Sequence, residues 1–147
     1  MIRTETEYQA SRKRAEEQAR LLKQQESKLA AEGLKAEQIK RALDPMRSFA
    51  AQVSEEIETY ERLKRAEFSE LRNLQGIGQM LVGIRIALGL SQREVAEKLG
   101  VHETQVSRDE RNEYFGITVD RASRILEALG VEVTTRVEKL PKLAKSA

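Results

Sequence analysis

The sequence contains no cysteine, no tryptophan and a single histidine. Without cysteine it can form neither a disulfide nor a thiolate nucleophile, which suits a reducing compartment, and we expect a cytoplasmic protein. Zinc sites draw mainly on cysteine and histidine, so no metal site is expected. No apolar stretch approaches the roughly 20 residues that a membrane-spanning helix needs. The opening MIRTETEYQA also lacks the apolar core of a secretion signal, so no membrane association is expected.

Aromatic residues make up only 4% of the chain, whereas charged residues make up 34%. A large hydrophobic core is therefore not expected. Alanine, leucine, glutamate, lysine, arginine and glutamine predominate over two prolines, which favours helix. The acids and the lone histidine form no catalytic cluster, and no glycine-rich loop is placed to hold a phosphate, so we expect neither an enzyme nor a cofactor. The net charge of +2 permits nucleic-acid binding without requiring it.

Two long amphipathic helices are predicted within residues 1–68. Thr4 and Glu7 have the spacing of a capping box, which marks a helix start. Asp44 and Pro45 mark a second start after a short helical piece, because aspartate caps helices and proline fits the first helical position. The narrow apolar stripes of the two helices are Tyr8, Ala15, Leu22 and Leu29, then Met46, Phe49, Val53, Ile57, Tyr60 and Leu63. We expect an antiparallel hairpin that either pairs with a second copy or serves as a spacer within one chain.

Shorter helices are predicted in residues 69–130, each bounded by a recognisable start or stop residue. The two starts are serine or threonine caps, and the three stops are glycines. These boundary residues are Gly89, Ser91, Gly100, Thr118 and Gly130. The alternation in VEVTTRV then predicts a β-strand in residues 131–138. Residues 139–147 are expected to form a disordered tail.

A tight corner between two of these helices is predicted at Gly100. Helices that cross over a short turn need a small residue where they approach, a turn residue that tolerates positive φ, and apolar residues in the inner angle. Ala96 and Gly100 meet the first two needs. The predicted core of this helix-turn-helix comprises Val95, Ala96, Leu99, Gly100, Val101 and Val106.

The stretch RIALGLSQREVAEKLGVHETQVSRDE resembles the Cro/C1-type (XRE) helix-turn-helix domain of phage repressors and bacterial regulators, and the resemblance extends over about residues 77–133. It implies a five-helix DNA-binding domain, usually a homodimer on a near-palindromic operator. The expected fold is thus all-α, with a helical hairpin for dimerisation or partner binding in residues 1–68. The DNA-binding domain would occupy residues 69–130, followed by the short strand.

The same resemblance assigns roles to the polar segment Val101–Arg111, which matches the recognition helix. The residues implied to read bases in the major groove are Glu103, Thr104, Ser107 and Arg108. Gln92 and Arg85 are implied to lie at phosphates. Ser91 and His102 are each either a helix cap or a phosphate contact, and Arg111 is the basic residue that remains beyond the recognition helix to contact the backbone. Arg85 and Glu110 match the positions of a buried ion pair in the family, which would fix one helix against the recognition helix.

Two features depart from the family pattern. Asp109 stands where an apolar residue usually packs inward, so it is either solvated or paired with a cation such as Arg85 or Arg111. The loop RNEYFGIT lacks the usual basic residues, and Tyr114 and Phe115 within it are expected to pack the domain. The predicted strand has no partner within the chain, which points to pairing with a second copy or another protein.

These observations predict a homodimeric, sequence-specific transcriptional regulator whose partner is double-stranded DNA. An alternative is an antitoxin that binds a small toxin through the hairpin or the strand and represses its own operon. The opening IRTETEYQAS resembles the start of HigA-type antitoxins, which share this domain. The motif alone does not separate the two functions.

Overall fold

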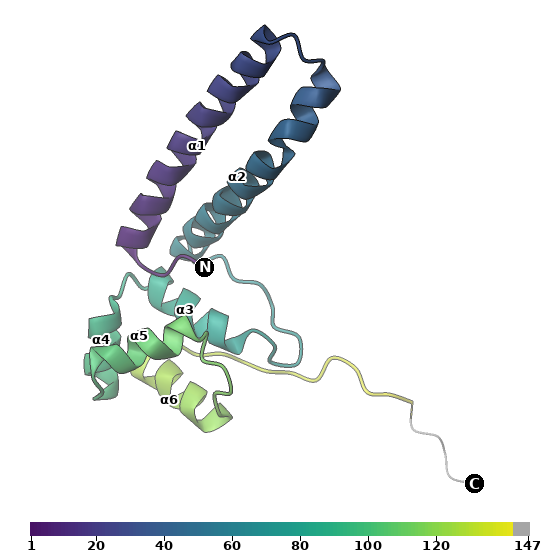
Figure 1. Cartoon of the computed structure of the whole chain (residues 1–147). Coiled ribbons are helices and arrows are strands. Elements are labelled where there is room, and N and C mark those ends of the chain that lie inside the picture. The colour runs from purple at the N-terminus through teal and green to yellow at the C-terminus, as the bar shows by residue number, and fades with distance from the viewer. Residues whose placement is uncertain (143–147) are drawn as a thin grey trace.

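A computed structural model describes residues 1–142 of the chain. Six α-helices and no strand lie within them, which confirms the all-helical class. The helices are α1 (Glu5–Ala31), α2 (Ala36–Lys64), α3 (Ile77–Ala87), α4 (Gln92–Leu99), α5 (Glu103–Arg111) and α6 (Val119–Leu129). Figure 1 shows α1 and α2 projecting as a long hairpin from a domain formed by α3 to α6. No helix in the described residues is long and apolar enough to cross a membrane.

The hairpin is antiparallel, as its apolar stripes predict. Thr4 caps α1 by accepting a hydrogen bond from the backbone N–H of Glu7 at 3.2 Å. At the base of the hairpin the rings of Tyr8 and Tyr60 stack with their centroids 4.9 Å apart. The Tyr8 hydroxyl donates to the carboxylate of Glu61 at 2.6 Å. An aromatic stack and a hydrogen bond thus join the two helices at the end that adjoins the rest of the molecule.

The second helix does not begin at Asp44 and Pro45, as the sequence pattern predicted. Instead α2 runs without a break from residue 36 to residue 64 with Pro45 inside it. A proline inside a helix removes one backbone hydrogen bond, which normally kinks or ends the helix. Here Leu43 is buried before the proline and Val53 is half-buried after it. We attribute the continuity of α2 to packing of this face against α1, which outweighs the local signal.

Helix α3 is the centre of the remaining domain, and its residues 81–86 are all buried. Helices α5 and α6 pack against it, α4 packs against α5 and α6, and local caps fix the helix ends. Thr118 accepts from the N–H of Arg121, and Gly130 ends α6 with a φ of 67°. Four helices follow residue 76 in the described part of the chain, where the resemblance implied five.

The predicted strand at residues 131–138 is wrong, since no residue from Val131 to Lys142 is in a strand. The backbone N–H of Val131 still bonds to Leu126 O at 2.9 Å, which closes the end of α6. Beyond it the chain runs extended and away from the domain (Figure 1). An extended segment becomes a strand only by pairing with another, and residues 1–142 offer it none. The end of the predicted disordered tail, residues 143–147, lies outside the described residues.

The hairpin and the four-helix domain share one continuous core. Ile2, Tyr8 and Tyr60 lie in the same buried cluster as residues of α3, α4, α5 and α6. Gly83 of α3 lies so close to α2 that an added Cβ would stand 2.7 Å from Leu63 Cδ2. The proposed boundary at residue 68 therefore falls between two parts that pack tightly together.

Candidate nucleic-acid interface

Helices α4 and α5 meet at the corner that the sequence predicted. Ser91 caps α4 by accepting from the N–H of Glu94, whose carboxylate accepts in turn from the N–H of Ser91 at 2.7 Å. This backbone hydrogen bond lowers the pKa of Glu94. Gly100 makes the turn with a φ of 67°, a left-handed conformation that glycine adopts without strain. The N–H of Val101 then bonds to Ala96 O at 3.0 Å, which closes the corner.

The side chains of the predicted corner core face inward. Val95, Ala96 and Val106 are buried, and Leu99 and Val101 are half-buried against the same cluster. Only Gly100 lies at the surface, where it makes the turn. The spacing of small and apolar residues in the sequence thus corresponds to a packed helix-turn-helix.

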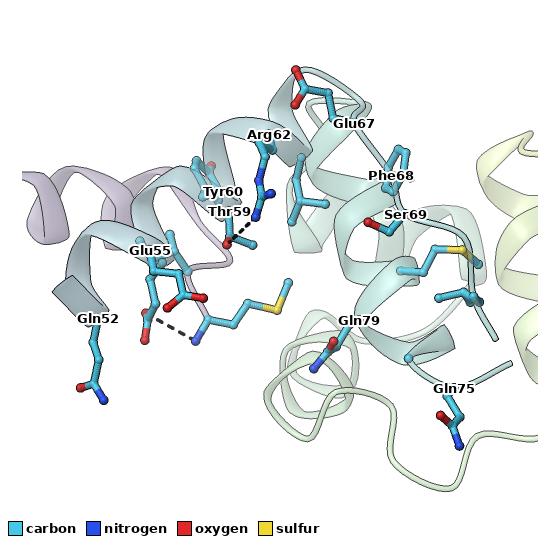
Figure 2. A pocket seen from close by; sticks show the side chains of 17 residues that line it. Gln52, Glu55, Thr59, Tyr60, Arg62, Glu67, Phe68, Ser69, Gln75 and Gln79 are labelled. Carbon is cyan, nitrogen blue, oxygen red and sulfur yellow. Dashed lines mark hydrogen bonds and ion pairs between the residues drawn. The ribbon is translucent and has the colours of Figure 1, made fainter. Parts of the chain in front are cut away.

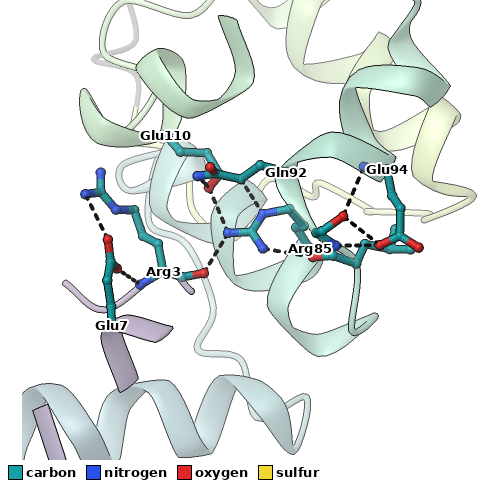
Figure 3. A network of polar contacts seen from close by, with 8 residues as sticks. Arg3, Glu7, Arg85, Gln92, Glu94 and Glu110 are labelled. Atoms are coloured by element: carbon teal, nitrogen blue, oxygen red, sulfur yellow. Dashed lines mark hydrogen bonds and ion pairs between the residues drawn. The ribbon is translucent and has the colours of Figure 1, made fainter. Parts of the chain in front are cut away.

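A buried ion pair joins α3 to α5. Arg85 Nε donates to Glu110 Oε1 at 2.5 Å and Arg85 Nη2 donates to Glu110 Oε2 at 2.8 Å, with side chains only 5% and 1% exposed. Arg85 Nη1 also donates to Leu90 O at 2.9 Å. Gln92 Nε2 donates to Glu110 Oε2 at 2.8 Å, so three helices converge on this carboxylate (Figure 3). Satisfying every charged atom in this way offsets much of the cost of burying them.

The N-terminal segment completes this network. Arg85 Nη2 donates to the backbone carbonyl of Arg3 at 2.8 Å, across 82 positions of sequence. Arg3 is held in turn by its own N–H, which donates to Glu7 Oε2 at 2.8 Å (Figure 3). A backbone carbonyl carries no side-chain identity, so the sequence offered no signal for this contact.

The four predicted base-reading residues all lie fully or partly at the surface of α5. Glu103, Thr104 and Arg108 are exposed and Ser107 is half-buried. None of the four belongs to the buried cluster. The corner therefore presents a polar helix face to solvent.

The predicted phosphate-binding residues fall into three groups. His102 and Arg111 are exposed, and His102 caps α5 by accepting from the N–H of Thr104 at 3.2 Å. Ser91 is exposed but engaged as a cap, and Gln92 is engaged with Glu110. Arg85 is buried with its donors committed inside the protein, which leaves it no surface for a phosphate contact.

Asp109 finds a cation, but not one of the two expected from the sequence. Its carboxylate accepts from the guanidinium of Arg121 on α6 rather than from Arg85 or Arg111. This pair ties α5 to α6. No sequence signal within α5 pointed to Arg121, because the contact depends on how α6 packs.

The loop after α5 contains two adjacent aromatic residues that differ in burial. Tyr114 is buried, as predicted, and burial raises the pKa of its hydroxyl. Phe115 is 95% exposed, so the prediction that it packs the domain is wrong. Glu113 and Tyr114 both have positive φ, at 52° and 51°, and this turn carries the chain outward after Tyr114. Glu113 is held by Gln79 Nε2, which donates to its carboxylate at 3.0 Å.

Comparison with known proteins also identifies a helix-turn-helix in the part of the chain that contains α4 and α5. A family model described as helix-turn-helix matches residues 84–135. No curated protein and no solved structure matches the chain. Within the described residues, no group of three or more histidine, aspartate or glutamate side chains is arranged to hold a metal ion.

Proposed function

We propose that the chain, a DNA-binding transcriptional regulator with a Cro/C1-type (XRE) helix-turn-helix domain at residues 84–135, acts as a homodimer on a near-palindromic operator. Each subunit would place α5 in one of two successive major grooves, whose centres lie about 34 Å apart. The two half-sites would then be related by the same two-fold axis as the subunits.

The observation that carries this proposal is the division of α5 into two sides. Its inner side is fixed by buried Val106 and by the Glu110 carboxylate, which is bonded to Arg85 and Gln92. Its outer side is polar and has no apolar residue that needs cover. A rigidly held helix with a free polar face is what direct reading of base edges requires.

The exposed residues suggest distinct contacts with DNA. Arg108 can donate two hydrogen bonds to O6 and N7 of a guanine, and the methyl group of Thr104 can pack against a thymine methyl. Glu103 can accept from the amino group of a cytosine, and its repulsion of phosphates makes it a specificity element. Ser107 would contribute a further hydrogen bond to a base.

Phosphates would be held at the edges of the same face. Arg111 supplies an exposed charge at the end of α5, and His102 lies exposed at its start. The N-terminus of α4 presents free backbone N–H groups behind Ser91, an arrangement that favours a phosphate oxygen. The side chain of Gln92 holds α5 in place by donating to Glu110. Its backbone N–H would remain available to bind the phosphate.

Selection of bound sequences from a random duplex pool tests the proposal directly. We expect enrichment of a two-fold symmetric site with half-site centres one helical turn apart, bound by two chains. Enrichment of a single asymmetric site bound by one chain would contradict the homodimer. No enrichment at all would contradict sequence-specific binding.

A second candidate, an antitoxin that also represses its own operon, is favoured by apolar side chains on the hairpin. Leu21, Met46 and Phe49 are between 37% and 49% exposed on helices that project away from α5. Such side chains on an otherwise charged hairpin suit a protein partner. Co-expression with the products of adjacent genes tests this candidate. A partner retained by the wild type and by Ser48→Glu but lost by Phe49→Glu would support it, whereas equal retention by all three would exclude this face.

A further inference from the structure

The short segment ahead of α1 is held inside the protein although it belongs to no helix. Ile2 is 4% exposed and lies in the buried cluster that also contains residues of α3 to α6. Ile2 borders a pocket of about 820 Å³ between α2 and the start of α3, which Tyr60 and Met80 also line (Figure 2). Packing of Ile2 in the cluster therefore helps to keep the segment from shifting into this space.

Arg3, the next residue, is fixed by the start of α1. Its N–H donates to Glu7 Oε2 at 2.8 Å, and its guanidinium lies 3.8 Å from Glu7 Oε1. Glu7 in turn donates its own N–H to the side chain of Thr4 at 3.2 Å, which caps the helix. The carbonyl of Arg3 is thus held between a buried side chain and a capped helix.

The carbonyl of Arg3 and the carboxylate of Glu110 accept from the same nitrogen of Arg85. Arg85 Nη2 donates to Arg3 O and to Glu110 Oε2, both at 2.8 Å (Figure 3). A terminal guanidinium nitrogen carries two hydrogens in the plane of the group, so two acceptors fix the orientation of that plane. A displacement of the Arg3 carbonyl would therefore turn the guanidinium relative to Glu110.

Glu110 transmits this constraint to α5. Its side chain is 1% exposed, and its carboxylate accepts from Arg85 and from Gln92. Arg108 lies on the same helix, within one turn of Glu110. A two-pronged contact between an arginine and a guanine needs donor–acceptor distances of about 2.7–3.2 Å, which a displacement of α5 by about 1 Å would break.

We propose that Ile2 is a positioning residue for sequence reading by α5. Its burial seats the Arg3 carbonyl, which orients Arg85 and, through Glu110, sets the position of Arg108 in the major groove. This inference rests on the proposed function, because it concerns the same face of α5. It gives the segment ahead of α1 a role in DNA recognition, although Ile2 itself is buried and contacts no base.

Two duplexes that differ by one base pair in each half-site isolate this effect. Both duplexes offer the same phosphates and bind the same number of subunits, so charge and subunit association cancel in the ratio of their dissociation constants. The ratio reports the contacts with the changed base alone. A role of Ile2 in stability only would leave the ratio unaltered in the folded protein.

Ile2→Ala should lower this ratio about fivefold at the base pair that Arg108 reads, since a well-placed two-pronged contact contributes that much or more. Ile2→Val removes a single carbon and should keep the ratio within about twofold of the wild type. Leu43→Ala is the matched control, because Leu43 is 3% exposed in α2 but lies outside the shared cluster. It should lose a similar amount of stability and keep the ratio. Circular dichroism and urea denaturation check that each variant is folded.

A pair of variants at Arg3 tests the carbonyl without removing a buried side chain. Arg3→Ala and Arg3→Gly both keep the backbone N–H and carbonyl, and both remove the guanidinium near Glu7. Only glycine also frees the backbone. The ratio should be about twofold lower for Arg3→Gly than for Arg3→Ala. This pair gives the answer if Ile2→Ala does not fold.

Two results would overturn the proposal. One is a ratio that folded Ile2→Ala keeps, or that Leu43→Ala lowers by as much as Ile2→Ala does. The other is an equal ratio for Arg3→Gly and Arg3→Ala.

The wild-type protein separates this inference from the proposed function. A wild type that distinguishes no two duplexes would contradict sequence-specific binding itself. A wild type that selects an operator, together with a folded Ile2→Ala that reads it equally well, would leave the regulator intact and exclude the role of Ile2.

Discussion

Arg85 and Glu110 place two opposite charges inside a small core, where either charge alone would be costly. Glu110→Gln keeps the shape of the side chain but leaves the Arg85 guanidinium without its counter-charge. We expect the free energy of unfolding to fall by about 3 kcal/mol or more, measured by urea denaturation. Glu97→Gln, which removes an exposed pair with Arg93, should change it by less than about 1 kcal/mol. Equal effects of the two substitutions would contradict the role given to the buried pair.

Arg108 is the residue whose loss should change which sequence is bound. Arg108→Ala removes a two-pronged contact with guanine, so discrimination at one base pair of each half-site should fall by about 1–3 kcal/mol. The measurement is a competition gel shift with single-base variants of the selected operator. Arg20→Ala, an exposed arginine on α1, should leave the preference unchanged. An unaltered preference in Arg108→Ala would refute the assigned register of α5.

The burial and the partners of individual side chains were the features that the sequence predicted least well. Tyr114 and Phe115 are adjacent aromatic residues, and composition treats them alike, yet one is buried and the other is not. The difference arises from two consecutive residues with positive φ, which no local pattern in RNEYFGIT indicates. The partner of Asp109 was missed for a related reason, because it lies on another helix.

At the scale of helices, the ends were predictable because they depend on neighbouring residues. Ser91, Gly100, Thr118 and Gly130 cap or end helices where the sequence places them. The corner at Gly100 was predictable too, since small and apolar residues at fixed spacing define it. Two predictions at this scale were wrong, namely a helix start at Pro45 and a strand after Val131. Both outcomes depend on contacts between segments that are distant in the sequence.

Pro45 shows how such a contact can be tested. Pro45→Ala restores a backbone N–H that can donate to Arg41 O, and alanine has the higher helix propensity. We expect the free energy of unfolding to rise by about 1–3 kcal/mol, measured by thermal or urea denaturation. Ser54→Ala, another exposed position of α2, should add about 0.5 kcal/mol at most. A loss of stability in Pro45→Ala would mean that the packing of α2 depends on the proline.

At the scale of the whole molecule, the number of subunits on DNA sets the dependence of binding on salt. Each neutralised phosphate contributes about −0.9 to the slope of log K against log salt. Arg111→Ala should therefore make the slope less steep by about 1.8 if two subunits bind, and by about 0.9 if one does. The slopes are measured by titration at several salt concentrations, with Arg20→Ala as a control that leaves the slope unaltered. If the slope is the same in Arg111→Ala and in the wild type, Arg111 does not contact a phosphate.

The contact between Arg85 and the Arg3 carbonyl means that the domain formed by α3 to α6 is not structurally independent of the N-terminal segment. A fragment severed ahead of Ser69 would lose that acceptor, and it would strip Ile2 and Tyr60 from the shared interior. The guanidinium that orients α5 would then need water in place of a peptide oxygen. A fragment that contains α3 to α6 would therefore also need the N-terminal segment and the base of α1 and α2 to keep its native core.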